Sequence, residues 1–216
     1  MPTIHLTKLD AAKRQLVAAV ELYFRDGDPV SVHTLGWSAY TSLGDLGKHR
    51  GVPPNFFQHF LAFCGNDKEK RKKLALMFRH ARNFFEHAKD DSDATLDFDP
   101  ILSVGTISDA ILHYEILSNN EFVPSLFLFT SWNFLNQTDK HEPHLRRFIE
   151  GVFRGAFVAA QGNRAKYYAD AMPLALELEK IFSQKDLSTV DPKFIGTLLD
   201  AVGLNPSKQT LLGGKS

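Results

Sequence analysis

Apolar residues recur every three or four positions along most of this chain, and proline and glycine divide it into segments of helical length. That spacing places apolar side chains on one face of an α-helix, whereas a strand would alternate with a period of two. Proline is tolerated in the first turn of a helix, and glycine often follows the last. The pattern predicts an all-α protein, with helices at 7–25, 29–50, 54–64, 68–91, 100–119, 124–136, 143–160, 164–184 and 191–202.

A break in the helical pattern between Asn119 and Pro124 predicts how the 216 residues are organised. We expect an N-terminal helical bundle over 1–120, additional C-terminal helices packed on it as a layer over 121–204, and a flexible tail over 205–216. A single fused domain is the alternative, and the chain length suits both arrangements.

The composition limits the class of partner. Lys+Arg and Asp+Glu number 25 each, so a charged partner must be recognised locally rather than by the net charge of the chain. The most apolar run, Phe122–Leu135, is too short and too interrupted by polar residues to span a membrane. A single cysteine, Cys64, fits a reducing compartment, and no secretory leader is recognisable. We expect a soluble, cytoplasmic protein of bacterial type without a metal or other cofactor.

The stretch Lys68–Asp91, KEKRKKLALMFRHARNFFEHAKDD, combines a predicted buried face, a run of basic residues and a candidate chemical motif. Its core-facing stripe is predicted to hold Leu74, Phe78, Ala81, Phe85 and Ala88. The residues His80, Asn83 and His87 share an arc roughly opposite to that stripe. At about 100° per residue, Arg82 lies about 140° from His87. One copy of such a helix would not readily direct both side chains to one phosphate.

The hexapeptide Arg82–His87, RNFFEH, resembles the Arg-x(4–6)-His signature of the HEPN superfamily, in which a polar residue directly follows the arginine. HEPN domains are helical bundles, commonly dimeric, found in bacterial toxin–antitoxin and defence systems, and many are metal-independent endoribonucleases. The likeness covers about residues 7–119 and leaves the C-terminal helices unexplained. It implies a catalytic set of Arg82, Asn83 and His87.

A looser likeness involves three short segments, GDPVSVHTL over 27–35, KHRG over 48–51 and NFFEHAKDD over 83–91. They look like parts of a group of small uncharacterised bacterial helical proteins. That likeness implies a helical bundle and no particular activity.

An Arg–His pair suits RNA cleavage chemically. A histidine can act as acid or base when the RNA 2′-hydroxyl attacks its adjacent phosphate, and the arginine fork can hold that phosphate and stabilise the added charge. Asn83 would position the phosphate or tune His87. Two copies facing each other would supply groups that one helix cannot bring together, so we expect a homodimer.

The basic run favours RNA as a partner, because a phosphate-rich ligand would offset the unfavourable positive charge in the first turn of a helix. A solvated surface is the alternative. The predicted RNA-binding residues are Lys70, Lys72, Lys73, Arg79 and His80.

The helix predicted at 29–50 carries two stripes. One holds Val32, Leu35, Ala39, Leu43 and Leu46, and the opposite one holds His33, Trp37, Tyr40, Gly44 and Gly47. The first interpretation is a central helix buried on both sides, in which Gly44 and Gly47 permit close approach of another backbone. The second is a small-ligand pocket lined by His33, Trp37 and Tyr40.

Two functions from different classes are consistent with these patterns. The first is a dimeric, HEPN-like, metal-independent endoribonuclease or RNA-binding protein. The alternative is a non-catalytic helical module for protein–protein interaction or dimerisation, whose Phe-rich segments Phe122–Leu135 and Phe153–Phe157 would bind a protein partner or a second copy. The sequence leaves open whether the protein is an enzyme.

Overall fold

The computed structural model describes residues 3–52, 67–87, 92–136 and 143–183. All regular secondary structure in these ranges is α-helical, which confirms the predicted all-α class. The helices predicted at 54–64 and 191–202 and the tail at 205–216 lie outside the described residues. The chain divides into two compact units, Met1–Glu121 and Phe122–Ser216, called unit 1 and unit 2 below.

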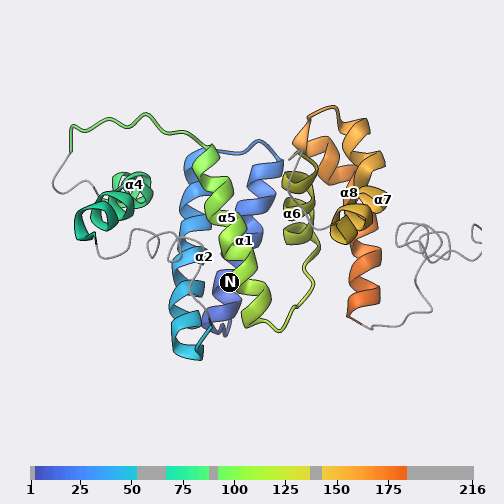
Figure 1. Ribbon diagram of the computed structural model, residues 1–216, viewed down its shortest axis with the longest axis horizontal. Coiled ribbons are helices and arrows are strands. Elements are labelled where there is room, and N and C mark those ends of the chain that lie inside the picture. The colour runs from blue at the N-terminus through green and yellow to red at the C-terminus, as the bar shows by residue number, and fades with distance from the viewer. Residues whose placement is uncertain (1–2, 53–66, 88–91, 137–142, 184–216) are drawn as a thin grey trace, which may run out of the picture. The chain divides into compact units, whose positions relative to one another are not determined.

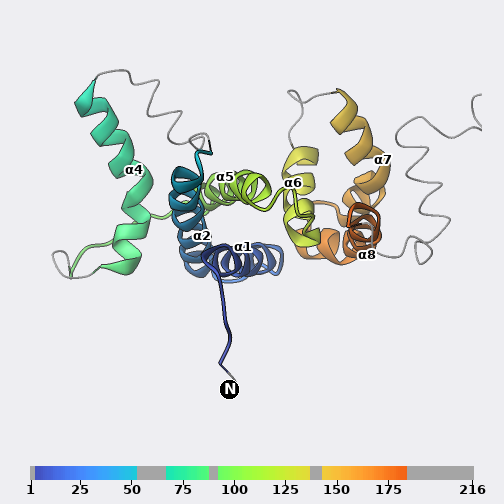
Figure 2. The same cartoon turned by 90° about the horizontal axis from the view of Figure 1, so that it is seen from below.

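Unit 1 contains the helices α1 (Lys8–Phe24), α2 (Pro29–Arg50), α4 (Lys68–Glu86) and α5 (Ile101–Leu117). Figures 1 and 2 show α1, α2 and α5 packed side by side and α4 crossing α2 at a steep angle. The core of this unit is aliphatic and aromatic, and its most buried large side chains are Leu16, Phe24, Leu43, Ile107, Ile111 and Tyr114. Burial of each such side chain contributes about 1.5–3 kcal/mol of stabilisation.

Local capping signals set the helix ends in unit 1. The Thr7 hydroxyl accepts a hydrogen bond from the Asp10 amide at 3.1 Å, and the Asp10 carboxylate accepts one from the Thr7 amide at 3.0 Å. This capping box begins α1. The Asp28 carboxylate accepts a bond from the Ser31 amide at 2.8 Å at the start of α2, and Gly51 ends α2 in the left-handed conformation with φ of 68°.

Helix α2 is buried on both sides, as expected for a central helix, because residues of both predicted stripes are buried. Its closest approach to α5 is at Gly36, where an added Cβ would lie 2.8 Å from Cγ1 of Ile107. At Gly47 an added Cβ would lie 3.5 Å from Cδ2 of His113, an ordinary contact. Of the two glycines predicted to permit close approach, Gly44 and Gly47, the contact at Gly47 does not require glycine, whereas the contact at Gly36 does.

The end of unit 1 is tied to its core by Glu121. The Tyr114 hydroxyl on α5 donates a hydrogen bond to the Glu121 carboxylate, and Lys13 Nζ on α1 lies 2.6 Å from Glu121 Oε1. The bond from Lys13, with a smaller contribution from Tyr114, lowers the pKa of Glu121. Burial and the Glu121 carboxylate raise the pKa of Tyr114. This network joins α1, α5 and the last residue of the unit.

Unit 2 contains α6 (Pro124–Asn136), α7 (Pro143–Ala160) and α8 (Arg164–Phe182), and its core is aromatic. The rings of Trp132 and Tyr167 lie 5.0 Å apart between centroids, in the offset range that aromatic pairs favour. The rings of Phe129, Phe134 and Phe153 are buried within the unit. These three rings belong to the core of the unit, so a partner that bound the Phe-rich segments would contact other residues of them.

None of the helices that the structure describes combines the length and the apolar character that a membrane span needs. This agrees with the interrupted apolar run at Phe122–Leu135, which forms most of α6.

Candidate functional site

Aromatic contacts fix the C-terminal half of α4 against α2. The ring centroid of Phe85 lies 5.8 Å from that of His33 on α2 and 5.1 Å from that of Phe98, which precedes α5. One turn earlier, Ala81 is buried, as predicted for the core-facing stripe. The side chains of Leu74 and Phe78, together with Ala88, lie outside the described parts. These contacts position the neighbouring residues Arg82 to His87.

Helix α4 ends at Glu86, so the prediction that it continues to residue 91 is wrong. His87 is the C-cap in an extended conformation, with φ of −134° and ψ of 121°, and its amide donates a hydrogen bond to the Asn83 carbonyl at 3.0 Å. The regular 100° step per residue therefore does not apply to the His87 side chain. The predicted separation of about 140° assumed a helical His87, so it does not describe how Arg82 and His87 are placed.

Arg82 and His87 come together around one carboxylate oxygen. Arg82 Nε donates a hydrogen bond to Glu86 Oε2 at 2.8 Å, and His87 Nε2 lies 4.0 Å from the same oxygen. The exposed fractions of the Arg82, Glu86 and His87 side chains are 34%, 30% and 63%. These three residues, named the α4 cluster below, are all accessible to a ligand in solution. Asn83 is exposed beside them.

The sequence reasoning missed Glu86. Its signal was present, because an acidic residue four positions after an arginine on a helix commonly forms an ion pair with it. Its carboxylate lies within 4.0 Å of both Arg82 and His87. Any anion that binds Arg82 and His87 must therefore share the site with Glu86.

The predicted pocket residues form a buried aromatic layer next to the α4 cluster. His33 is 2% exposed, stacks on Trp37 with ring centroids 6.1 Å apart, and Trp37 in turn contacts Tyr40. His33 Nδ1 lies 3.2 Å from the Ser103 hydroxyl on α5. Burial lowers the pKa of His33, and the negative charge of Glu86 partly opposes that shift.

Two nitrogens of this layer are buried without a hydrogen-bond partner in the described structure, His33 Nε2 and Trp37 Nε1. Each such group costs about 1–3 kcal/mol of stability. Ring packing and the single contact of His33 Nδ1 with Ser103 therefore hold the layer together. The layer contacts α4 through the rings of His33 and Phe85.

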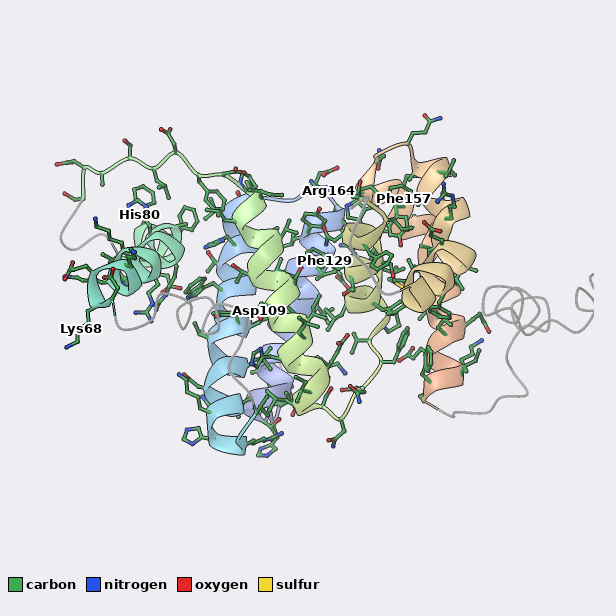
Figure 3. All side chains as sticks on the ribbon, viewed as in Figure 1. Lys68, His80, Asp109, Phe129, Phe157 and Arg164 are labelled. Atoms are coloured by element: carbon green, nitrogen blue, oxygen red, sulfur yellow. The ribbon has the colours of Figure 1, made fainter. Side chains whose placement is uncertain are left out.

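The predicted RNA-binding residues lie on α4, away from its contacts with α2. Lys72, Lys73, Arg79 and His80, named the basic face below, are exposed and make no ion pair within the described residues. Lys70 is also exposed and lies 3.6 Å from Asp67, the residue that caps the helix. Figure 3 shows His80 and Lys68 on this helix. The structure therefore groups these positive charges on the helix that ends in the α4 cluster.

Among the described residues, no three His, Cys, Asp or Glu side chains gather as metal ligands would. The α4 cluster contains one carboxylate and one imidazole, fewer than the three protein ligands of a typical catalytic zinc site. The chemistry of the cluster is that of a cation, an acid–base group and an internal anion.

The fold and the site together define an all-helical protein with an exposed Arg–His pair on a basic helix. Comparison of the chain with protein-family models, with curated proteins and with solved structures gives no match. The assignment of a function therefore depends on the geometry of the site.

Proposed function

We propose that this protein binds RNA along α4 and cleaves it at Arg82 and His87 without a metal, in the manner of a HEPN-like endoribonuclease. One observation carries the proposal: the two side chains are exposed and meet at the same oxygen atom of Glu86, at 2.8 Å and 4.0 Å. A phosphate oxygen in a similar place would accept a hydrogen bond from Arg82 and would lie near His87. This geometry is available in one copy of the chain.

The reaction assigns a separate task to each group. His87 takes the proton of the RNA 2′-hydroxyl while its oxygen attacks the adjacent phosphorus, and the bond from phosphorus to the 5′-oxygen breaks. Arg82 balances the charge that builds on the phosphate oxygens. The leaving 5′-oxygen takes a proton from an acid, so the products are a 2′,3′-cyclic phosphate and a 5′-hydroxyl. Asn83, exposed beside Arg82, would position the phosphate.

The acid for the leaving oxygen favours a second copy of the chain. The α4 cluster has a single histidine, and the nearby His33 is buried. In a homodimer, His87 of the second copy would donate that proton while the first accepts one. The proposed partner set is therefore RNA and a second copy.

The basic face supports binding of the RNA backbone. Its side chains are exposed and unpaired within the described residues, so they are available to phosphates. Positively charged side chains that neutralise phosphates release counterions, which makes affinity fall steeply with salt. We expect RNA to bind weakly at high salt and to lose further affinity when Lys72 or Arg79 is replaced.

The test is cleavage of single-stranded RNA by the full chain in the presence of a metal chelator. We expect products with 2′,3′-cyclic phosphate ends and a loss of rate of about 100-fold or more in Arg82→Ala and in His87→Ala. Arg25→Ala and His49→Ala, at exposed positions outside the cluster, are matched controls and should retain the rate. Full activity in either cluster variant, with its circular dichroism spectrum unchanged, would refute the assignment.

A second candidate is a non-catalytic interaction module, and it is favoured by an apolar stripe on α5. Ile101, Leu112 and Ile116, named the α5 stripe, are 62%, 57% and 53% exposed. Exposed apolar groups on one helix face commonly mark an interface. For this function Leu112→Glu should convert an oligomer to a monomer in light scattering, while Ile4→Glu, at another exposed apolar position, should not. A monomeric wild-type protein would contradict it.

A further inference from the structure

The α4 cluster contains an anion of its own. Glu86 Oε2 accepts the hydrogen bond of Arg82 Nε at 2.8 Å and lies 4.0 Å from His87 Nε2. It thus occupies the place between the two basic side chains where the phosphate of the proposed substrate would be held. This inference rests on the proposed function, because it concerns the same site.

The distances separate two possible tasks for Glu86. A carboxylate that orients a histidine does so through a hydrogen bond, and 4.0 Å is too long for one. The 2.8 Å contact with Arg82 is instead a charge-assisted hydrogen bond to the group that would bind phosphate. Glu86 therefore acts mainly on the arginine.

The arginine fork is only partly used by this contact. Glu86 bonds to Nε, and the terminal Nη groups of Arg82 make no hydrogen bond within the described residues. A phosphate can approach those groups, but it then lies close to the Glu86 carboxylate. Two like charges at such a distance repel each other. The negative charge of Glu86 also extends to the buried His33, whose pKa it influences.

We propose that Glu86 is an internal competitor for the phosphodiester and sets the affinity of the site for RNA. An RNA phosphate binds Arg82 and His87 by displacing the Glu86 carboxylate. The carboxylate disfavours an anion that binds only at Arg82 and His87. RNA still binds, because the basic face contacts its neighbouring phosphates at the same time and offsets the free energy needed to displace Glu86. Removal of the charge at Glu86 should therefore strengthen RNA binding, in contrast to removal of the charge at Arg82.

The experiment measures binding of a short, fluorescently labelled RNA with 2′-O-methyl groups, which lacks the hydroxyl needed for cleavage. Glu86→Gln keeps the size of the side chain and removes its charge, and we expect its affinity to rise about three- to tenfold at low salt. Glu69→Gln, at an exposed acid in the first turn of α4, is the matched control for loss of one negative charge from the helix. Its effect should be smaller.

A double variant locates the effect. In an Arg82→Ala background, Glu86→Gln should raise the affinity no more than Glu69→Gln does, because the contested cation is gone. Glu86→Ser is a second variant that removes the same charge, and it should also bind RNA more tightly than wild type. Equal or weaker binding by both Glu86 variants would overturn the inference, as would a gain no larger than that of Glu69→Gln.

The same measurements keep the two proposals apart. If Arg82→Ala weakens RNA binding and Glu86→Gln does not strengthen it, the competitor role is wrong and the proposed RNA site stands. If Arg82→Ala and His87→Ala leave both binding and cleavage unchanged, the proposed function is wrong. If neither the wild type nor Glu86→Gln binds RNA, both are wrong.

Discussion

Gly36→Ala should destabilise unit 1 although alanine is the better helix former. The substitution relieves the helix-propensity penalty of glycine, which is about 1 kcal/mol. However, the new Cβ would lie 2.8 Å from Cγ1 of Ile107. The Ile107 side chain is completely buried, so it cannot relieve this overlap by turning outward into solvent. Overpacking of this kind costs about 1–3 kcal/mol. The free energy of unfolding should therefore fall, by up to about 2 kcal/mol.

Gly105→Ala on α5 is the matched control, because an added Cβ there meets nothing within 4 Å and the residue is exposed. It should raise the free energy of unfolding by about 0.5–1 kcal/mol. The assay is urea unfolding followed by tryptophan fluorescence. The chain has 2 tryptophans, and Trp132→Phe leaves Trp37 as the reporter of unit 1. A Gly36→Ala protein stabilised as much as Gly105→Ala would refute the packing argument.

Two further predictions concern the cap of α8 and the last residue of unit 1. Asn163→Ala should cost unit 2 about 1 kcal/mol in thermal or urea unfolding, because the Asn163 side chain caps α8 by accepting a hydrogen bond from the Lys166 amide at 2.8 Å; unchanged stability would contradict this. Glu121→Gln should lower stability at neutral pH. The folded-state pKa of Glu121 lies below its usual 4.5, so its stabilising contribution is fully present above pH 4.5 and is lost as the pH falls through the folded-state pKa. In acid, the free energies of unfolding of the wild type and the variant should therefore become equal. A difference that persists in acid would exclude ionisation as the cause.

Much of the fold could be predicted because its signals are local. The capping box of Thr7 and Asp10, the Asp28 cap and the left-handed Gly51 each depend on side chains within one turn of the helix end. The burial of α2 on both sides followed from its two apolar stripes. The close approach at Gly36 did not, since it depends on Ile107 of α5, which is distant in the sequence.

The candidate site shows the same limit. Arg82, Asn83 and His87 were singled out by the resemblance to the HEPN signature, and the helical wheel applied to His87 assumed a helix that continues beyond Glu86. The extended backbone of His87 brings its ring toward Glu86. The sequence has no glycine or proline at this point that would have predicted the end of the helix. An ion pair such as that of Glu86 with Arg82 is common on helices. Only the structure shows that the Glu86 carboxylate lies near both Arg82 and His87.

The network at Glu121 has a consequence for dissecting this protein. The last residue of unit 1 is bonded to Lys13 near the start of α1 and to Tyr114 near the end of α5. A protease that cuts after Glu121 would leave Lys13, Tyr114 and Glu121 on one fragment. A cut a few residues earlier would remove the Glu121 carboxylate and leave the buried Tyr114 hydroxyl without its hydrogen-bond acceptor. The N-terminal fragment should therefore resist trimming down to Glu121 and lose that resistance once this residue is removed.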